Sequence, residues 1–211
     1  MQVRIKALQS QINPHFLNNT LEIINWEARI AKNEKVSAMI EALSTLLDAD
    51  LNRDNRNLVP LSEELRYVDA YLYIIRERLG DRFITDKVID DTLLHLQIPR
   101  LILQPIVENA VEHDITPRRG GKLTLRVRKT GRTLVMEVEH DGVMTCEDLE
   151  NINKLTALPA DSDEITAGGV GQIGVRNVSS RLKMLYGEHG SLNITQVSDT
   201  TVLAQIRLPL D

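Results

Sequence analysis

His15 is the first residue whose type and neighbours suggest chemistry, because it directly follows Pro14 in the stretch QINPHFLNNT. The surrounding apolar spacing predicts a helix, and a proline inside a helix removes a hydrogen bond and costs about 3 kcal/mol. A kink at Pro14 would turn the next side chain outward, where an imidazole nitrogen can act as a nucleophile. A lone histidine at the edge of an apolar stripe is more often structural, so both interpretations stay open.

A second group of polar residues lies in the stretch LILQPIVENAVEHD, residues 101–114. On a helix Glu108 and Glu112 are i, i+4 neighbours, and so are Asn109 and His113. An amide and a carboxylate that project from an otherwise apolar helix could hold a hydrated Mg²⁺. An ordinary solvated helix face is the alternative, because such polar pairs are common on helices of globular proteins.

Four glycines occur in GGVGQIGVRN, residues 168–177, where the chain enters a predicted helix. The backbone N–H groups of such a segment could bind phosphate, helped by the positive end of the helix dipole. A flexible loop or a helix cap is the alternative, because neither the Walker nor the Rossmann spacing is present. The five histidines of the chain lie far apart and lack the spacing of zinc ligands, which argues against a zinc site.

The elements that must position these residues begin with two helices. Apolar residues at helical spacing predict one helix over residues 3–31 and a second from Val36 to Leu47, with a break at Asn33. The resulting hairpin has one apolar seam, and no other segment is obviously long enough to cover it. A second copy of the hairpin would cover the seam, so residues 1–60 are predicted to form a homodimeric four-helix bundle.

The periodicity changes after a third predicted helix, residues 61–80, which connects the hairpin to the rest of the chain. Alternating apolar residues predict a β-hairpin around Thr130-Gly131. Further strands are expected near residues 83–89, 93–98, 191–197 and 201–208, helices at 100–113 and 174–186, and a lid or unstructured loop over 145–173. The prediction is therefore an α+β fold, in which residues 61–211 form a sandwich of a mixed or antiparallel sheet with helices on one face.

The composition limits the class of protein. The chain has 211 residues, 42% of them hydrophobic, which is enough for a sizeable core. The formal net charge is -5 and the basic residues are dispersed, so nucleic acid is not an expected partner. The single cysteine, Cys146, excludes an internal disulfide framework, and the sequence shows neither a signal peptide nor an apolar run of about 20 residues. A reducing, cytosolic environment is expected.

Three stretches together resemble the LytS-type sensor histidine kinases. LQSQINPHFLNNTL resembles their phospho-acceptor segment, LQPIVENAVEH their N-box, and GQIGVRNVSSRLKMLYG their glycine box with the following helix. The resemblance covers essentially the whole chain in order and spacing. It implies a dimerisation and phospho-acceptor hairpin followed by a Bergerat-type sandwich of the GHKL class that binds ATP and Mg²⁺. It also implies a response regulator as partner and a full-length protein anchored in the cell membrane by a sensor region outside this chain, with these domains in the cytoplasm.

The resemblance assigns roles to individual residues. His15 would accept the γ-phosphoryl group, Asn109 would bind Mg²⁺, and Glu108 would act beside it at the metal or its water. Gly174 and Asn177 would lie at the phosphates and the lid hinge. The complete set expected to contact the nucleotide is Asn109, His113, His140, Asp141, Gly142, Gly171, Gly174 and Asn177.

The chain departs from the family pattern at the adenine-binding turn, where His140 and Met144 replace an aspartate and a glycine. Gln172 replaces the glycine that usually opens the glycine box, and Glu112 and Asp114 add negative charge after the N-box. Loss of one charge-assisted hydrogen bond costs about 1.5–3 kcal/mol, which predicts roughly ten- to hundredfold weaker ATP binding. A signalling or scaffold module of the same fold, with weak or absent ATP binding, is therefore the alternative to an active autokinase.

Overall fold

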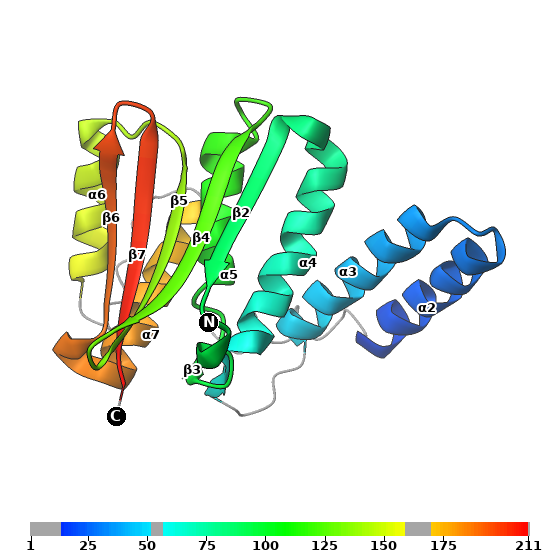
Figure 1. The fold of residues 1–211 in the computed structure, drawn as a ribbon, viewed down its shortest axis with the longest axis horizontal. Helices are drawn as coiled ribbons and strands as arrows, with labels where there is room; N and C mark the ends of the chain where they lie inside the picture. Colours follow the sequence, from blue (N-terminus) through cyan, green and yellow to red (C-terminus); the bar gives the residue numbers. More distant parts are fainter. Residues whose placement is uncertain (1–13, 52–56, 159–169, 211) are drawn as a thin grey trace, which may run out of the picture. The chain divides into compact units, whose positions relative to one another are not determined.

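The computed structural model describes residues 14–51, 57–158 and 170–210, which fall into two compact units, Met1–Asn55 and Arg56–Asp211. The first unit contains helices α2 (Pro14–Ile30) and α3 (Glu34–Leu51), which pack side by side as an antiparallel hairpin (Figure 1). The Asn33 side chain accepts a hydrogen bond from the backbone N–H of Val36 at 3.2 Å and so caps the start of α3. The predicted break at Asn33 is confirmed.

Pro14 is the first described residue of α2, and proline is well tolerated in the first turn of a helix. The part of the predicted helix before Pro14, residues 3–13, lies outside the described residues. The kink expected at Pro14 is therefore neither supported nor contradicted.

The second unit is built on a five-stranded sheet in the order β2-β4-β5-β7-β6. Its strands are β2 (Phe83–Ile89), β4 (Gly121–Thr130), β5 (Thr133–Asp141), β6 (Ser191–Ser198) and β7 (Thr201–Pro209). Strands β2 and β4 are parallel, and the other three neighbouring pairs are antiparallel, so the sheet is mixed. The predicted hairpin around Gly131 is confirmed, with Thr130 paired to Thr133.

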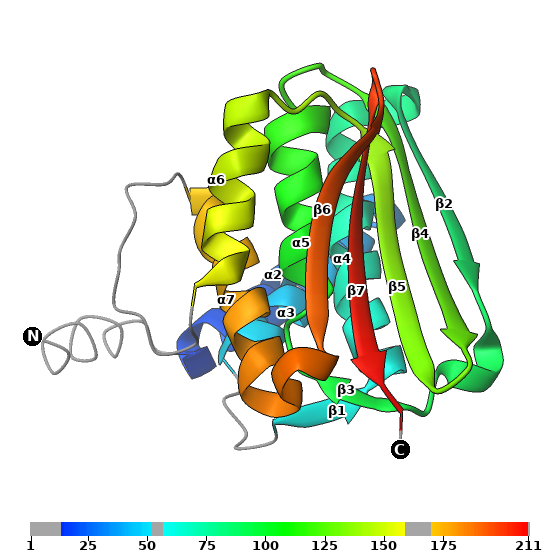
Figure 2. The same ribbon diagram turned by 90° about the vertical axis from the view of Figure 1, so that its left-hand side faces the viewer.

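Four helices cover one face of this sheet (Figure 2). They are α4 (Leu61–Leu79), α5 (Gln104–Ala110), α6 (Cys146–Ala157) and α7 (Val170–Tyr186). Helix α5 continues into a π-helical turn, η3 (Val111–Ile115), and single 3₁₀ turns occur as η1 (Gly80–Arg82), η2 (Asp91–Leu93) and η4 (Gly187–His189). The core lies between the helices and the inward-facing residues of the strands, for example Leu125, Met136 and Ile206. The expected α+β class is confirmed.

Three local features differ from the sequence-based expectations. A short strand β1 (Leu58–Pro60) pairs with β3 (Gln97–Pro99), so the second unit begins before Leu61, and the strand expected over 93–98 is shorter and later. Helix α4, which was expected only to connect the hairpin to the rest of the chain, is also part of the second unit, because Val68, Leu72 and Ile75 lie in its core. Helix α6 occupies the first half of the expected lid, and the segment 159–169 lies outside the described residues.

Glu64 of α4 is fully buried and fixes the chain just before α5. Its carboxylate accepts hydrogen bonds from the backbone N–H groups of Leu101, Ile102 and Leu103, at 2.6, 3.1 and 3.1 Å. Burial raises the pKa of Glu64, and the three N–H donors oppose that rise. Leu101 has a left-handed backbone (φ 55°), which is unfavourable for a branched side chain, so this bonding compensates local strain.

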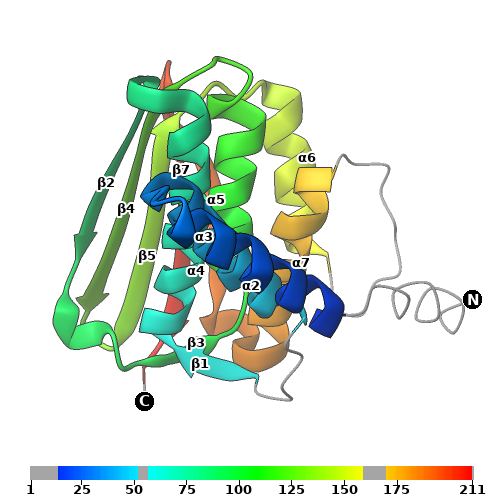
Figure 3. The same cartoon turned by 90° about the vertical axis from the view of Figure 1, so that its right-hand side faces the viewer.

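Figure 3 shows the helical hairpin in a view turned by 90° from that of Figure 1. Buried side chains in its described part are few and mostly small: Ala28, Ser37, Ile40, Ala42 and Ala49. Polar contacts link the two helices, with Asn18 bonded to Asp48 and Ser37 bonded to Asn25. Among the described residues, no helix is both long and apolar enough to cross a bilayer.

Candidate functional site

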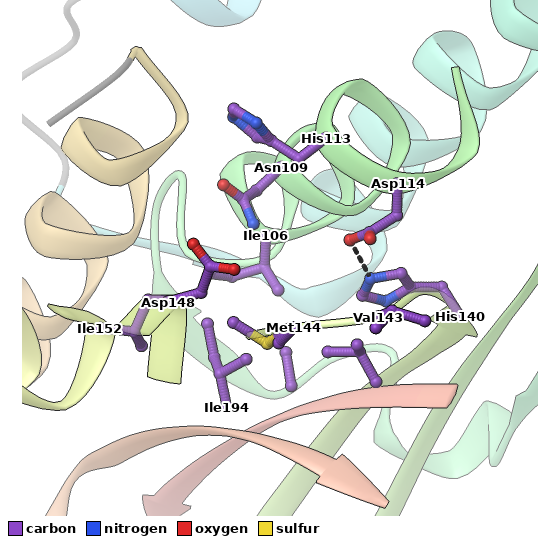
Figure 4. Close-up of a pocket in the computed structure, with 12 residues that line it drawn as sticks. Ile106, Asn109, His113, Asp114, His140, Val143, Met144, Asp148, Ile152 and Ile194 are labelled. Carbon is purple, nitrogen blue, oxygen red and sulfur yellow. Dashed lines mark hydrogen bonds and ion pairs between the residues drawn. The ribbon is translucent and has the colours of Figure 1, made fainter. Parts of the chain in front are cut away.

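A pocket of about 280 Å³ opens between the helices and one end of the sheet of the second unit (Figure 4). Its wall comes from α5 and η3, from the end of β5 with the turn that follows, and from α6, β6 and β7. The lining residues are Ile106, Asn109, His113, Asp114, His140, Val143, Met144, Asp148, Ile152, Ile194, Val202 and Ala204. The volume is close to the lower end of the range for ligand sites, and the lining combines seven apolar residues with five polar ones.

Helix α5 and its π-helical extension bring Asn109 and His113 to the pocket, one turn apart, as the i, i+4 spacing predicted. Glu108 does not line the pocket. Its carboxylate accepts a hydrogen bond from the Gln104 side chain at 2.7 Å. Glu108 and Asn109 therefore lie on different faces of the helix, and only Asn109 adjoins the cavity.

His140 lies at the end of β5 with its side chain only 4% exposed. Its Nε2 atom is 3.0 Å from Oδ2 of Asp114 on the π-helical turn (Figure 4). The sequence suggested that Asp114 adds charge near phosphates, but its carboxylate is engaged by the imidazole of His140. The expectation of weakened binding treated His140 as a lone ring, whereas the pocket contains an imidazole–carboxylate pair.

The turn after β5 is held in place by Gln196 of β6. The Gln196 side chain accepts a hydrogen bond from the Met144 backbone N–H at 2.7 Å and donates one to the Gly142 carbonyl at 3.2 Å. Met144 thereby becomes part of the pocket wall. Sequence reasoning missed Gln196 because a single polar residue in a strand carries no local signal; the structure places it next to an irregularity in β6 pairing.

Asp148 reaches the pocket from the first turn of α6 and was also missed. Its carboxylate forms a capping box with Thr145, and the hydrogen bonds from Thr145 hold the pKa of Asp148 below its usual range. The signal was present in the sequence as a threonine followed three residues later by an acid. It was overlooked because the whole segment 145–173 was interpreted as a loop.

Several residues that the resemblance assigned to the nucleotide do not line this pocket. Asp141 points to the other side of β5, where it accepts a hydrogen bond from the Lys122 backbone N–H at 2.8 Å. Gly174 lies where α7 packs on α5, and an added Cβ would be 3.5 Å from Cβ of Pro105. Asn177 is exposed on α7, and Gly171 belongs to the first turn of that helix.

Gly142 does not line the pocket, but its lack of a side chain shapes it. A Cβ atom at Gly142 would come within 2.8 Å of Cγ and Oδ1 of Asp114. The glycine is therefore required for the Asp114 carboxylate to reach His140.

His15 belongs to the other unit, on the exposed side of the first turn of α2. The side chain of Asn19, one turn later, lies with its amide nitrogen 3.3 Å from Nδ1 of His15. Such a contact restricts the orientation of the ring and influences which of its nitrogens carries the proton.

Among residues 14–51, 57–158 and 170–210 there is no cluster of three or more histidine, cysteine or acidic side chains that could hold a metal ion. A site made entirely of protein ligands is thus not formed by the described residues. Mg²⁺ commonly binds through one or two protein oxygens together with substrate phosphates, and the Asn109 amide at the pocket offers one such oxygen.

Comparison with known sequences agrees with this architecture. The profile of the histidine kinase-, DNA gyrase B- and HSP90-like ATPases matches residues 96–211, more than half of the chain, and a histidine kinase profile matches residues 3–83. The chain is 34% identical to the sensor protein LytS of Oceanobacillus iheyensis and 33% identical to the sensor histidine kinase YesM of Bacillus subtilis, over 99% of its own length in both cases. It spans only about a third of either relative, 34% and 33%.

Solved structures share the fold. The histidine kinase domain of a blue-light-activated kinase from Erythrobacter litoralis aligns with a TM-score of 0.50 at 20% identity, covering 94% of this chain and 86% of that domain. Full-length ShkA in complex with AMPPNP aligns with a TM-score of 0.53 at 15% identity, covering 93% of this chain and 44% of ShkA. The fold and the sequence profiles agree, and the chain, which is similar in sequence to sensor histidine kinases, therefore belongs to the histidine kinase-, DNA gyrase B- and HSP90-like ATPases.

Proposed function

We propose that this chain is the kinase core of a two-component sensor histidine kinase. It binds ATP in the pocket of the second unit, transfers the γ-phosphoryl group to His15, and passes it on to an aspartate of a response regulator. The observation that carries the proposal is the pocket itself, which combines apolar walls with Asn109 and a buried polar pair in a chain of this ATPase family.

The pocket fits the base of a nucleotide better than the whole molecule. Ile106, Ile152 and Ile194 supply apolar surface for a flat ring, and the volume of about 280 Å³ leaves the triphosphate to lie outside. Asn109 would supply an oxygen ligand to Mg²⁺, which neutralises phosphate charge when bound. Phosphoryl transfer needs positioning and charge neutralisation more than covalent assistance from the protein.

The environment of His15 suits a phospho-acceptor. The ring is exposed in the first turn of a helix, where a phosphoryl donor can reach it. A neutral imidazole nitrogen is the nucleophile, and the Asn19 side chain beside Nδ1 orients the ring. The nucleotide pocket and His15 lie in separate units, so the transfer requires the two units to meet.

The hairpin supports the proposal of a homodimer. Large apolar side chains remain exposed on it, including Phe16, Ile23, Trp26 and Ile30, each more than 60% exposed. A contiguous apolar surface of this kind on a soluble domain marks an interface. A second hairpin would complete a four-helix bundle, with one His15 on each protomer.

The resemblance alone supports the remaining parts of the proposal. The curated relatives are sensor proteins about three times as long as this chain, since the chain covers 34% of LytS and 33% of YesM. We expect the whole protein to be anchored in the cell membrane by a sensor region and to hold this core in the cytoplasm. The response regulator would be recognised by the hairpin that presents His15.

Incubation with Mg-ATP labelled at the γ-phosphate tests the proposal. Phosphate should appear on the protein as an acid-labile, base-stable adduct, because a phosphoramidate hydrolyses once it is protonated. The label should be lost in His15→Gln and kept in His189→Gln, a matched change of another exposed histidine. Label that survives in His15→Gln, or no binding of Mg-ATP by calorimetry, would contradict the proposal.

A further inference from the structure

Asp148 gives the pocket a carboxylate that the proposed function does not yet use. The residue belongs to the first turn of α6 and lines the cavity. Figure 4 shows its side chain pointing toward the part of the cavity bordered by Ile106 and Asn109, while His140 lies on the other side. Asp148 is exposed, in contrast to the buried His140, so its carboxylate lies at the open end of the pocket, where a ligand can reach it.

One oxygen of the Asp148 carboxylate is occupied, and the other is available. Oδ2 accepts hydrogen bonds from the backbone N–H and from the hydroxyl of Thr145, at 2.9 and 2.6 Å. These bonds orient the carboxylate and hold its pKa below the usual range, so the group is ionised at neutral pH. No donor among the described residues bonds to Oδ1. Because an ionised carboxylate only accepts hydrogen bonds, the ligand atom that meets Oδ1 must carry a hydrogen.

The chemistry of a nucleotide limits which of its groups can meet this oxygen. Phosphate oxygens are negatively charged acceptors, so a carboxylate repels them. The free ring nitrogens of adenine are acceptors as well and offer no hydrogen. The donors that remain are the exocyclic amino group of the base and the hydroxyls of the ribose.

The depth of the site distinguishes between these two kinds of donor. In the proposed complex the cavity of about 280 Å³ holds the base, the triphosphate lies outside, and the ribose joins the two. The amino group lies at the end of adenine opposite to the ribose, so a base that enters first carries its amino group to the closed end. Asp148 lies at the open end, where the ribose is expected. Carboxylates also bind ribose hydroxyls in unrelated dinucleotide-binding folds.

We propose that Asp148 is the ribose-recognition residue of this kinase core, with Oδ1 accepting a hydrogen bond from a ribose hydroxyl. The inference rests on the proposed ATP binding and deepens it, because it assigns the sugar of the nucleotide to a particular side chain. The site then distinguishes ribonucleotides from deoxyribonucleotides.

Calorimetric titration of the whole chain with Mg-ATP, Mg-2′-deoxy-ATP and Mg-3′-deoxy-ATP tests the inference, because these ligands share the base and the triphosphate. The wild type should bind at least one deoxy analogue about tenfold or more weakly than ATP, the effect of one lost hydrogen bond to a charged group. Asp148→Asn should weaken ATP binding and leave the binding of that analogue almost unchanged, because any hydrogen bond to the hydroxyl is then neutral. The amide oxygen can still accept from the Thr145 N–H, so α6 keeps a cap.

Glu147→Gln is the matched control for this variant. Glu147 is an exposed acid next to Asp148 in the first turn of α6, and it does not line the pocket. The change removes one negative charge from the same end of the helix, so the preference for ATP over the deoxy analogue should remain. Circular dichroism checks that both variants are folded before titration.

The outcomes separate the inference from the proposed function. A wild type that binds none of these nucleotides would overturn both. Equal affinity for ATP and both analogues, or a preference that Asp148→Asn leaves unchanged, would leave ATP binding in place and overturn the role of Asp148. An equal change of all the affinities in Asp148→Asn would also overturn it, because the carboxylate would then act on the phosphates or on Mg²⁺, which the ligands share.

Discussion

The two units of this chain differ in how completely they bury their apolar residues. In the second unit a continuous core of large side chains, among them Leu103, Leu125 and Leu182, lies between the sheet and its helices. In the hairpin the described buried side chains are mostly alanines, and larger apolar residues face outward. These exposed residues are Phe16, Ile23, Ile24, Trp26, Ile30, Val36 and Leu43.

This difference indicates that the second unit is stabilised by its own core, whereas the hairpin depends on contacts with another chain. The second unit has a large core of its own, whereas the described hairpin buries few large side chains to offset the entropy of ordering two helices. Several of its described intramolecular contacts are polar, such as the hydrogen bond between Asn25 and Ser37 at 2.5 Å. The hairpin should therefore respond strongly to protein concentration, and the second unit should not.

The largest expected effect comes from a cavity in the core of the second unit. Leu182→Ala removes a fully buried side chain and should lower the free energy of unfolding of that unit by about 2–5 kcal/mol. Leu185→Ala on the same helix, where the side chain is 43% exposed, is the matched control with a smaller effect. Trp26 is the only tryptophan, so its fluorescence follows the hairpin, and far-ultraviolet circular dichroism follows both units. A fluorescence transition that moves with Leu182→Ala would contradict independent units.

An intermediate effect is expected at the apolar surface of the hairpin. Ile23→Ser should raise the dissociation constant of the dimer by at least about tenfold, because an isoleucine buried in an interface contributes roughly 1.5–3 kcal/mol. Ile84→Ser changes an isoleucine of β2 in the second unit that is also largely exposed, 55% against 65% for Ile23, and should leave the dimer intact. Sedimentation equilibrium at micromolar concentrations measures both. A wild-type chain that stays monomeric would rule out the dimer.

The smallest expected effect concerns the surface ion pair of the hairpin. The Arg29 guanidinium lies 2.5 Å from Glu41 and, with Asn25, lowers the pKa of that carboxyl below its ordinary value of 4.5. The stabilisation is therefore present above pH 4.5 and is lost as the pH falls through the lowered pKa of the folded state. As both side chains are exposed, it should not exceed about 1 kcal/mol.

The pH dependence of hairpin unfolding, followed by Trp26 fluorescence, measures this contribution. The wild type should lose more stability between pH 6 and pH 3 than Arg29→Gln does, because only the wild type has the guanidinium that holds Glu41 ionised. Identical pH profiles for the two proteins would show that the pair contributes nothing.

Most of the fold was predicted from the local spacing of apolar residues. The alternation in β4 and β5 and the helical spacing in α3 and α4 are properties of neighbouring residues, which the sequence displays directly. Helix α6 was missed because its residues are mostly polar, and the capping box of Thr145 and Asp148 was its clearest signal. The parallel pairing of β2 with β4 depends on contacts between strands distant in sequence and has no local pattern.

The candidate site was harder to predict for the same reason. Asn109 and His113 were found because they share a helix face, one turn apart. The contact between Asp114 and His140 joins residues 26 positions apart in the chain, and the sequence around neither residue contains a pattern that predicts it. The alternation of β5 did imply that His140 and Asp141 point to opposite faces, but the resemblance had assigned both to the nucleotide.

The buried carboxylate of Glu64 has a mechanical consequence for the pocket. It joins α4 to the three residues that lead into α5, and Arg181 of α7 donates hydrogen bonds to the carbonyls of Arg100 and Leu101 in the same segment. Helices α4 and α7 are therefore both bonded to the segment that leads into α5. We therefore expect a lengthwise shift of α4 to move the start of α5 and, with it, Asn109 at the pocket.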